Sequence, residues 1–156
     1  MTVQVGVAGA RRLSVWVLVI AGVVVAGLMV VASRYGFHRD EYYFVVTGQH
    51  PAVAAPDNPM LVPYLAAGWY AAVGGHLCAF RILPAVAVGG YFVFGGLLAR
   101  EFVASRAHQI PAAPATSLLA IVLHCGPLFS STPFDVLTPS AAWLSLISAL
   151  PFPARW

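Results

Sequence analysis

The chain has 156 residues, of which 60% are hydrophobic and 8% are charged, and its mean hydropathy is +0.84. Soluble domains carry about 25% charged residues, so this composition excludes an ordinary soluble fold and indicates an integral membrane protein. The net charge of +3 arises from arginine without lysine and is too small to indicate nucleic-acid binding. Cys78 and Cys125 lie in or beside apolar runs without the spacing of a metal site, which favours buried free thiols over a disulfide.

The first long apolar stretch extends from Leu13 to Ala32. A helix needs about 20 apolar residues to cross a bilayer, because each residue rises about 1.5 Å through a core about 30 Å thick. We therefore predict a cytoplasmic N-terminus over residues 1–12 and a transmembrane helix over 13–33. Two arginines before the stretch resemble the start of a signal peptide, but signal peptides have shorter apolar stretches of about 7–15 residues. An uncleaved anchor is the favoured interpretation.

A charged segment follows the first span. Of the chain's 13 charged residues, 8 basic and 5 acidic, four lie here within eight positions: Arg34, Arg39, Asp40 and Glu41. Because the bilayer core does not tolerate such a cluster, we place it at the outer mouth of the membrane helices. On charge alone, the segment could be a solvated turn in which Arg34 and Arg39 anchor the helix end.

Three more apolar stretches predict transmembrane helices, over residues 82–99, 113–130 and 136–152. The remaining segments would be a cytoplasmic loop, an outer loop and the C-terminus, over residues 100–112, 131–135 and 153–156. A further stretch, residues 59–80, is long enough to cross but is broken by prolines and glycines. If it lies on the membrane surface, five arginines face the cytoplasm and three face outward, which the positive-inside rule prefers over the reverse.

The expected fold class is therefore all-α and multi-pass, with about four transmembrane spans. A long non-cytoplasmic loop over residues 34–81 would carry one or two interfacial helices, because its tryptophan and tyrosines favour the headgroup level. We expect the protein in the plasma (inner) membrane, with its N-terminus in the cytoplasm and the lipid bilayer as its first partner.

Several short motifs follow one another along the chain. They are Arg39-Asp40-Glu41-Tyr42-Tyr43, Asp57-Asn58-Pro59 with Leu61-Val62-Pro63, Arg81-Ile82-Leu83-Pro84 with Ala99-Arg100-Glu101, and Phe134-Asp135. In this order and spacing, over about residues 13 to 150, the chain resembles the amino-terminal region of GT-C superfamily glycosyltransferases. The similarity is to the bacterial relatives of dolichyl-phosphate-mannose protein mannosyltransferases and of lipid A aminoarabinose transferases.

The resemblance implies inverting transfer of a hexose or pentose from a polyprenyl-phosphate-linked donor to an acceptor outside the cytoplasm. It maps the catalytic acidic residue of the family onto Asp40. A phosphate leaving group needs no general acid, so one carboxylate acting as a base can suffice. Glu41 and Asp57 are then candidate ligands of a divalent metal ion, with a donor-phosphate contact as the other option for Asp57. Arg39 and Arg81 are candidate contacts of the donor phosphate. For Glu41 and the two arginines, a purely structural role is the favoured interpretation.

Members of this family are several hundred residues long, so the resemblance also implies a truncated or split enzyme. Such a chain could be inactive alone, and a downstream-encoded remainder of the enzyme would be its partner. The alternative function is that of a non-catalytic small multi-pass membrane protein, either a gene remnant or an assembly partner.

Other residues allow two interpretations each. His38 and His50 with nearby carboxylates could bind zinc, although their spacing is not diagnostic. His124 could be a functional intramembrane group or an imidazole bonded to a neighbouring helix. Asp135 could be a surface anchor or a helix cap. The glycines of residues 89–96, GGYFVFGG, favour close helix packing over a phosphate-binding loop.

Overall fold

The computed structural model describes residues 13–50, 59–102, 110–112, 115 and 128–149. The main elements of this part of the chain are all helices, as expected. They are α1 (Val15–Ala32), α2 (Arg39–Gly48), α3 (Leu61–Ala72), α4 (Leu77–Phe102) and α7 (Thr132–Ala149).

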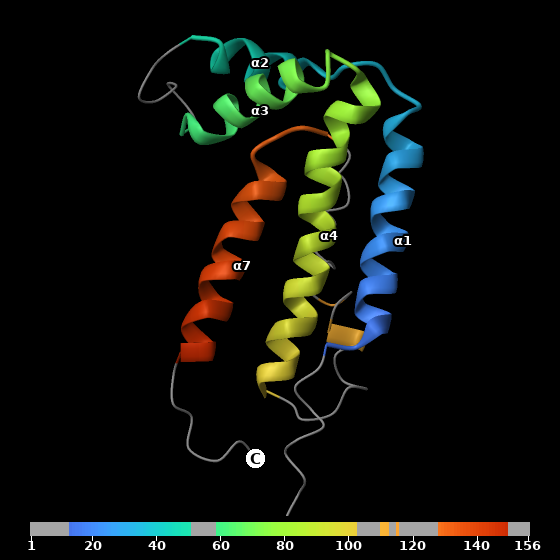
Figure 1. Cartoon of the computed structure of the whole chain (residues 1–156), viewed down its shortest axis with the longest axis vertical. Helices are drawn as coiled ribbons and strands as arrows, with labels where there is room; N and C mark the ends of the chain where they lie inside the picture. The colour runs from blue at the N-terminus through green and yellow to red at the C-terminus, as the bar shows by residue number, and fades with distance from the viewer. Residues whose placement is uncertain (1–12, 51–58, 103–109, 113–114, 116–127, 150–156) are drawn as a thin grey trace, which may run out of the picture.

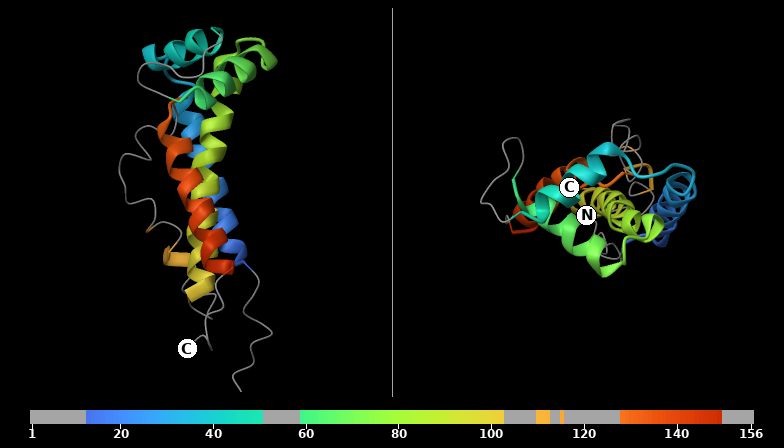
Figure 2. Two further views of the ribbon diagram at one scale, coloured as in Figure 1. Left: turned by 90° about the vertical axis from the view of Figure 1, so that its left-hand side faces the viewer. Right: turned by 90° about the horizontal axis from the view of Figure 1, so that it is seen from above.

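Three long helices, α1, α4 and α7, form a bundle, and the short helices α2 and α3 form a layer across one end of it (Figure 1). The three long helices lie side by side, with α4 packed against both α1 and α7. The two short helices, α2 and α3, pack against each other and lie across the end of the long helices (Figure 2). The charged segment therefore lies at one end of the bundle.

Two of the described helices, α1 and α4, are long and apolar enough to cross a membrane. Much of α1 presents apolar side chains outward, and Trp16, Val23 and Val30 are each 60% exposed or more. The expected span over 113–130 lies almost entirely outside the described residues. The expected span over 136–152 corresponds to α7, which begins four residues earlier, at Thr132. Its mean hydropathy is lower than that of α1 and α4, because it contains Asp, Pro, Ser and Thr.

The start of α4 differs from the sequence-based expectation. The helix begins at Leu77, five residues before the predicted start of the span at 82, so Arg81 lies inside a helix and not in a loop. An arginine can occupy this position because its charge is fully paired, as described below. The Gly74–Gly75 turn separates the end of α3 from the start of α4.

Glycine explains how α3 ends and α4 begins. Gly74 and Gly75 have φ values of 63° and 73°, a conformation that residues with a Cβ rarely adopt. Their N–H groups donate to the carbonyls of Ala71 and Tyr70, in the pattern of a Schellman helix end. At 12 residues, α3 is about 18 Å long, which is shorter than the hydrocarbon core of a bilayer, about 30 Å.

Other glycines let the helices approach closely. A Cβ on Gly89 would lie 2.6 Å from Val25 Cγ2 of α1, and one on Gly96 would lie 2.8 Å from Val17 Cγ1. One on Gly90 would lie 3.3 Å from Leu137 Cδ1 of α7. The prediction that these glycines serve helix packing is therefore confirmed.

Candidate functional site

The site begins at the first turn of α2. His38 is the N-cap: its N–H donates to Glu41 Oε2 at 2.8 Å, and its Nδ1 accepts the N–H of Asp40 at 3.3 Å. This reciprocal arrangement is a capping box with histidine in the place of serine or threonine. Because successive side chains of an α-helix diverge by about 100°, Asp40 and Glu41 leave this turn in different directions.

Glu41 points into the protein and pairs with Arg81 of α4. Both side chains are buried, with exposed fractions of 0% for Glu41 and 1% for Arg81. The pair is bidentate, since Arg81 Nε donates to Glu41 Oε1 at 2.8 Å and Nη2 donates to Oε2 at 2.7 Å. A buried charge is stable only when it is paired and hydrogen-bonded, and this geometry meets both conditions.

Arg81 also binds the end of α1. Nη1 donates to the carbonyls of Ala32 and Tyr35, and Nη2 donates to that of Gly36. The last carbonyls of a helix lack partners within the helix and carry partial negative charge, so a guanidinium is well suited to bind them. With these three bonds and the two to Glu41, each of the five N–H groups of Arg81 has a partner.

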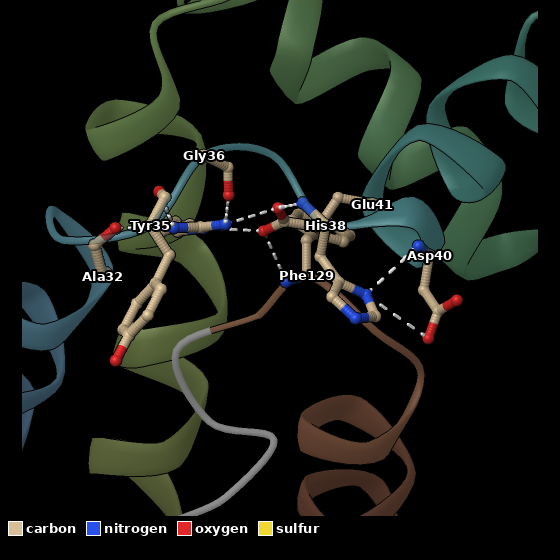
Figure 3. A network of polar contacts seen from close by, with 8 residues as sticks. Ala32, Tyr35, Gly36, His38, Asp40, Glu41 and Phe129 are labelled. Atoms are coloured by element: carbon tan, nitrogen blue, oxygen red, sulfur yellow. Dashed lines mark hydrogen bonds and ion pairs between the residues drawn. The ribbon is translucent and has the colours of Figure 1, made fainter.

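Glu41 is equally saturated (Figure 3). Oε1 accepts from Arg81 and from the N–H of Phe129 at 3.1 Å, while Oε2 accepts from Arg81 and from His38. A carboxylate has about four acceptor positions, and all four are taken. Glu41 therefore has no position left for a metal ion in this arrangement, and Arg81 has no N–H left for a phosphate. Their contacts support the structural role, which is the interpretation that the sequence favoured for both residues.

Aromatic rings surround the buried pair. Phe129 stacks on Phe80 at a centroid distance of 4.6 Å and an interplanar angle of 18°, and Phe134 lies 5.4 Å from Phe129. Phe37 and Tyr70 approach Phe80 from α2's leading loop and from α3, at 6.0 and 5.7 Å. The pair next to this cluster is shielded from water, which strengthens its hydrogen bonds.

Asp40 has a different environment from Glu41. Its side chain is 50% exposed and lies beside His38, on the other side from the pair (Figure 3). Its carboxylate is 3.6 Å from His38 Nδ1 and 3.5 Å from Nε of Arg39, whose side chain is 92% exposed. Because His38 Nδ1 accepts the Asp40 N–H, the ion pair of this carboxylate is the one with Arg39, and an ion pair this exposed contributes little to stability. The structure therefore leaves Asp40 and Arg39 accessible to a ligand.

The remaining candidates do not join this site. Asp57 and His124 lie outside the described residues. His38 and His50 flank α2, whose ten residues span about 15 Å, too far for one zinc ion. Among the described residues, no three His, Cys, Asp or Glu side chains lie close enough to hold a metal ion. Asp135 is exposed in the first turn of α7, as a helix-end anchor would be.

Two contacts near the site were not anticipated from the sequence. The first is the Phe129 N–H bond to Glu41, which no residue type predicts because the donor belongs to the backbone. The second joins α3 to α4: Trp69 Nε1 donates to the carbonyls of Ala79 and Phe80, at 3.1 and 3.2 Å. Pro84 lies four residues after Phe80 and has no N–H to donate to the Phe80 carbonyl. A proline inside an expected helix was therefore the sequence feature that could have indicated an outside donor.

No protein-family model, curated protein or solved structure matches the chain. The geometry nevertheless separates the charged side chains into two groups. Glu41 and Arg81 hold helices together, whereas Asp40 and Arg39 face outward at the end of the bundle.

Proposed function

We propose that the chain is the amino-terminal portion of a GT-C-type membrane glycosyltransferase. It would transfer a sugar from a polyprenyl-phosphate donor to an acceptor outside the cytoplasm. The motif order supports this proposal, and so does the presence of two helices that could span a membrane. The observation that carries it is the different placement of neighbouring carboxylates: Glu41 is buried and saturated, whereas Asp40 is half exposed and accessible.

In the proposed orientation, α1 and α4 cross the inner membrane and the N-terminus lies in the cytoplasm. Residues 113–130 and α7 would supply the third and fourth spans. The layer formed by α2 and α3 would lie at the non-cytoplasmic surface. Exposed tyrosines on and beside this layer suit the headgroup level: Tyr35, Tyr42, Tyr43 and Tyr64. With 12 residues, α3 is too short to cross the membrane.

Asp40 would act as the general base. An acceptor hydroxyl within about 3 Å of its carboxylate gives up its proton as the acceptor oxygen bonds to the anomeric carbon of the sugar. The bond from that carbon to the phosphate oxygen breaks at the same time, and its electron pair leaves with the polyprenyl phosphate. Attack opposite to the leaving group inverts the anomeric centre. Arg39, with its exposed guanidinium, is the proposed contact of the donor phosphate.

The geometry limits the proposal for a divalent metal ion. Glu41 does not fit as a ligand because its acceptor positions are filled, so no step is assigned to a metal ion there. Asp57 keeps its proposed role as a metal or donor-phosphate contact on the resemblance alone. Arg81 is assigned to holding α1 and α2, and not to the phosphate.

The test is the substitution Asp40→Asn in the complete enzyme assembly that contains this chain. It keeps the shape of the side chain and removes the base, so turnover of a polyprenyl-phosphate sugar should fall about 10²–10⁴-fold while membrane insertion stays normal. Asp135→Asn is the matched control, because it makes the same change at an exposed carboxylate of α7. Wild-type turnover in Asp40→Asn would favour the alternative of a non-catalytic assembly partner.

A further inference from the structure

The segment that leads into α7, residues 128–131, contacts the site from a distant part of the sequence. The N–H of Phe129 donates to Glu41 Oε1, although the two residues are 88 positions apart. The Phe129 ring is fully buried and stacks on Phe80 of α4. One residue of this segment thus binds both α2 and α4.

The docking of this segment has an unfavourable feature. Ser130 Oγ is buried and has no hydrogen-bond partner among the described residues. A buried hydroxyl without a partner costs free energy, because it has lost its hydrogen bonds to water. If the segment were released, Glu41 would keep its bonds to Arg81 and His38. Release would therefore remove the Phe129 N–H bond and expose the Phe129 ring, whereas the Glu41–Arg81 pair would remain.

We propose that residues 128–131 form a latch that fixes the first turn of α2 and thereby orients Asp40, with Phe129 as a positioning residue. The orientation of Asp40 matters only if it is the base, so this part of the inference rests on the proposed function. Glu41 follows Asp40 directly, so the Phe129 N–H, added to the bonds from Arg81 and His38, further restricts the rotation of that turn. A displacement of about 1 Å at a reacting group can lower a rate about 100-fold.

Hydrogen exchange of the α2 amides tests the latch without any assay of activity. The complete chain would be compared in lipid nanodiscs as wild type, Phe129→Pro and Ser130→Ala. Phe129→Pro removes both the donor N–H and the ring that stacks on Phe80, so the α2 amides should exchange about tenfold faster or more, while α1 keeps its protection. Ser130→Ala removes the unpartnered hydroxyl, so the same amides should exchange more slowly.

The second variant keeps the test decisive if Phe129→Pro fails to fold, because Ser130→Ala is a mild change that should strengthen docking. Unchanged α2 exchange in Ser130→Ala, or equal acceleration in all helices of a folded Phe129→Pro, would overturn the latch.

A kinetic measurement connects the latch to Asp40. In the complete assembly, Phe129→Ala removes the stacked ring, and we expect kcat to fall about tenfold or more with an unchanged KM for the donor. Phe129→Leu, which restores an apolar side chain, should recover part of kcat. A raised KM with an unchanged kcat would contradict the positioning role. If Asp40→Asn keeps wild-type turnover while α2 exchange responds as expected, the latch stands and the proposed function fails.

Discussion

Adjacent residues can have opposite roles when a helix separates their side chains. Asp40 and Glu41 are the same kind of acid, and the sequence alone made both candidates for chemistry. The capping box begins the helix at Arg39, which directs Glu41 toward Arg81 and leaves Asp40 half exposed. The environment of each side chain, and not its type, decides which carboxylate can accept a proton from a substrate.

The Arg81 pair leads to a stability prediction. Arg81→Ala should lower the free energy of unfolding by about 3–5 kcal/mol, because it leaves the charge of Glu41 buried and unpaired. Arg81→Lys should also destabilise, since an ammonium has three N–H groups for a site that uses five. The double variant Arg81→Met, Glu41→Gln should recover part of the loss, because neither charge remains.

Thermal unfolding of the purified chain in detergent measures these differences. Arg39→Ala is the control, because its side chain is 92% exposed and should change stability by no more than about 0.5 kcal/mol. Equal effects of Arg39→Ala and Arg81→Ala would show that the buried pair does not hold the helices together.

At the scale of the elements, α3 supports α4 where proline weakens it. Pro84 lacks the N–H that would bind the Phe80 carbonyl, and the indole of Trp69 supplies a donor from outside the helix. The same indole also binds Ala79, so α3 fixes the first turns of α4, where Arg81 lies. Hydrogen bonds therefore join α2 and α3 to α4, and α4 to the end of α1.

A double-mutant cycle tests this support. Trp69→Phe should cost about 1 kcal/mol of stability, since it leaves the Phe80 carbonyl without its donor. In a Pro84→Ala background, residue 84 supplies the N–H that binds the Phe80 carbonyl. Trp69→Phe should then cost at least about 0.5 kcal/mol less stability than it does in the wild type. Additive effects of the two changes in thermal unfolding would mean that Trp69 does not compensate for Pro84.

The sequence predicted those parts of the fold that depend on local patterns. The all-α class, the first apolar helix and the packing glycines of α4 follow from composition and spacing, and the structure confirms them. The start of α4 could not be predicted, because Arg81 resembles a loop residue until its partner is known. That partner lies 40 positions earlier in the chain.

The site was predicted only in part, for the same reason. The sequence predicted that Asp40, Glu41 and Arg81 lie at one end of the molecule. It could not predict that Asp40 is accessible while Glu41 and Arg81 are buried, because that depends on tertiary contacts. The N–H of Phe129 and the carbonyls around Arg81 are backbone groups, which are identical in every residue type except proline. No pattern of side chains could reveal them.

Among the described residues, charge lies at both ends of the long helices: the first turn of α2 and Arg81 at one end, and the Arg100–Glu101 pair at the other. The long helices α1 and α4 carry the first of these ends, where α2 and α3 cover Arg81 and leave Asp40 accessible (Figure 1). The proposed function requires the end with Asp40 to face outward from the cytoplasm, because a polyprenyl-phosphate sugar and its acceptor would meet there. Its central claim is therefore the membrane orientation.

Labelling of single cysteines in intact cells tests this claim most directly. In a background of Cys78→Ser and Cys125→Ser, Tyr35→Cys places a thiol at a position that is 69% exposed at the end with Asp40. Arg106→Cys places the second thiol in the predicted cytoplasmic loop. An impermeant maleimide should label position 35 and leave position 106 unlabelled until the cells are opened. Labelling of position 106 but not position 35 in intact cells would place Asp40 in the cytoplasm and contradict the account.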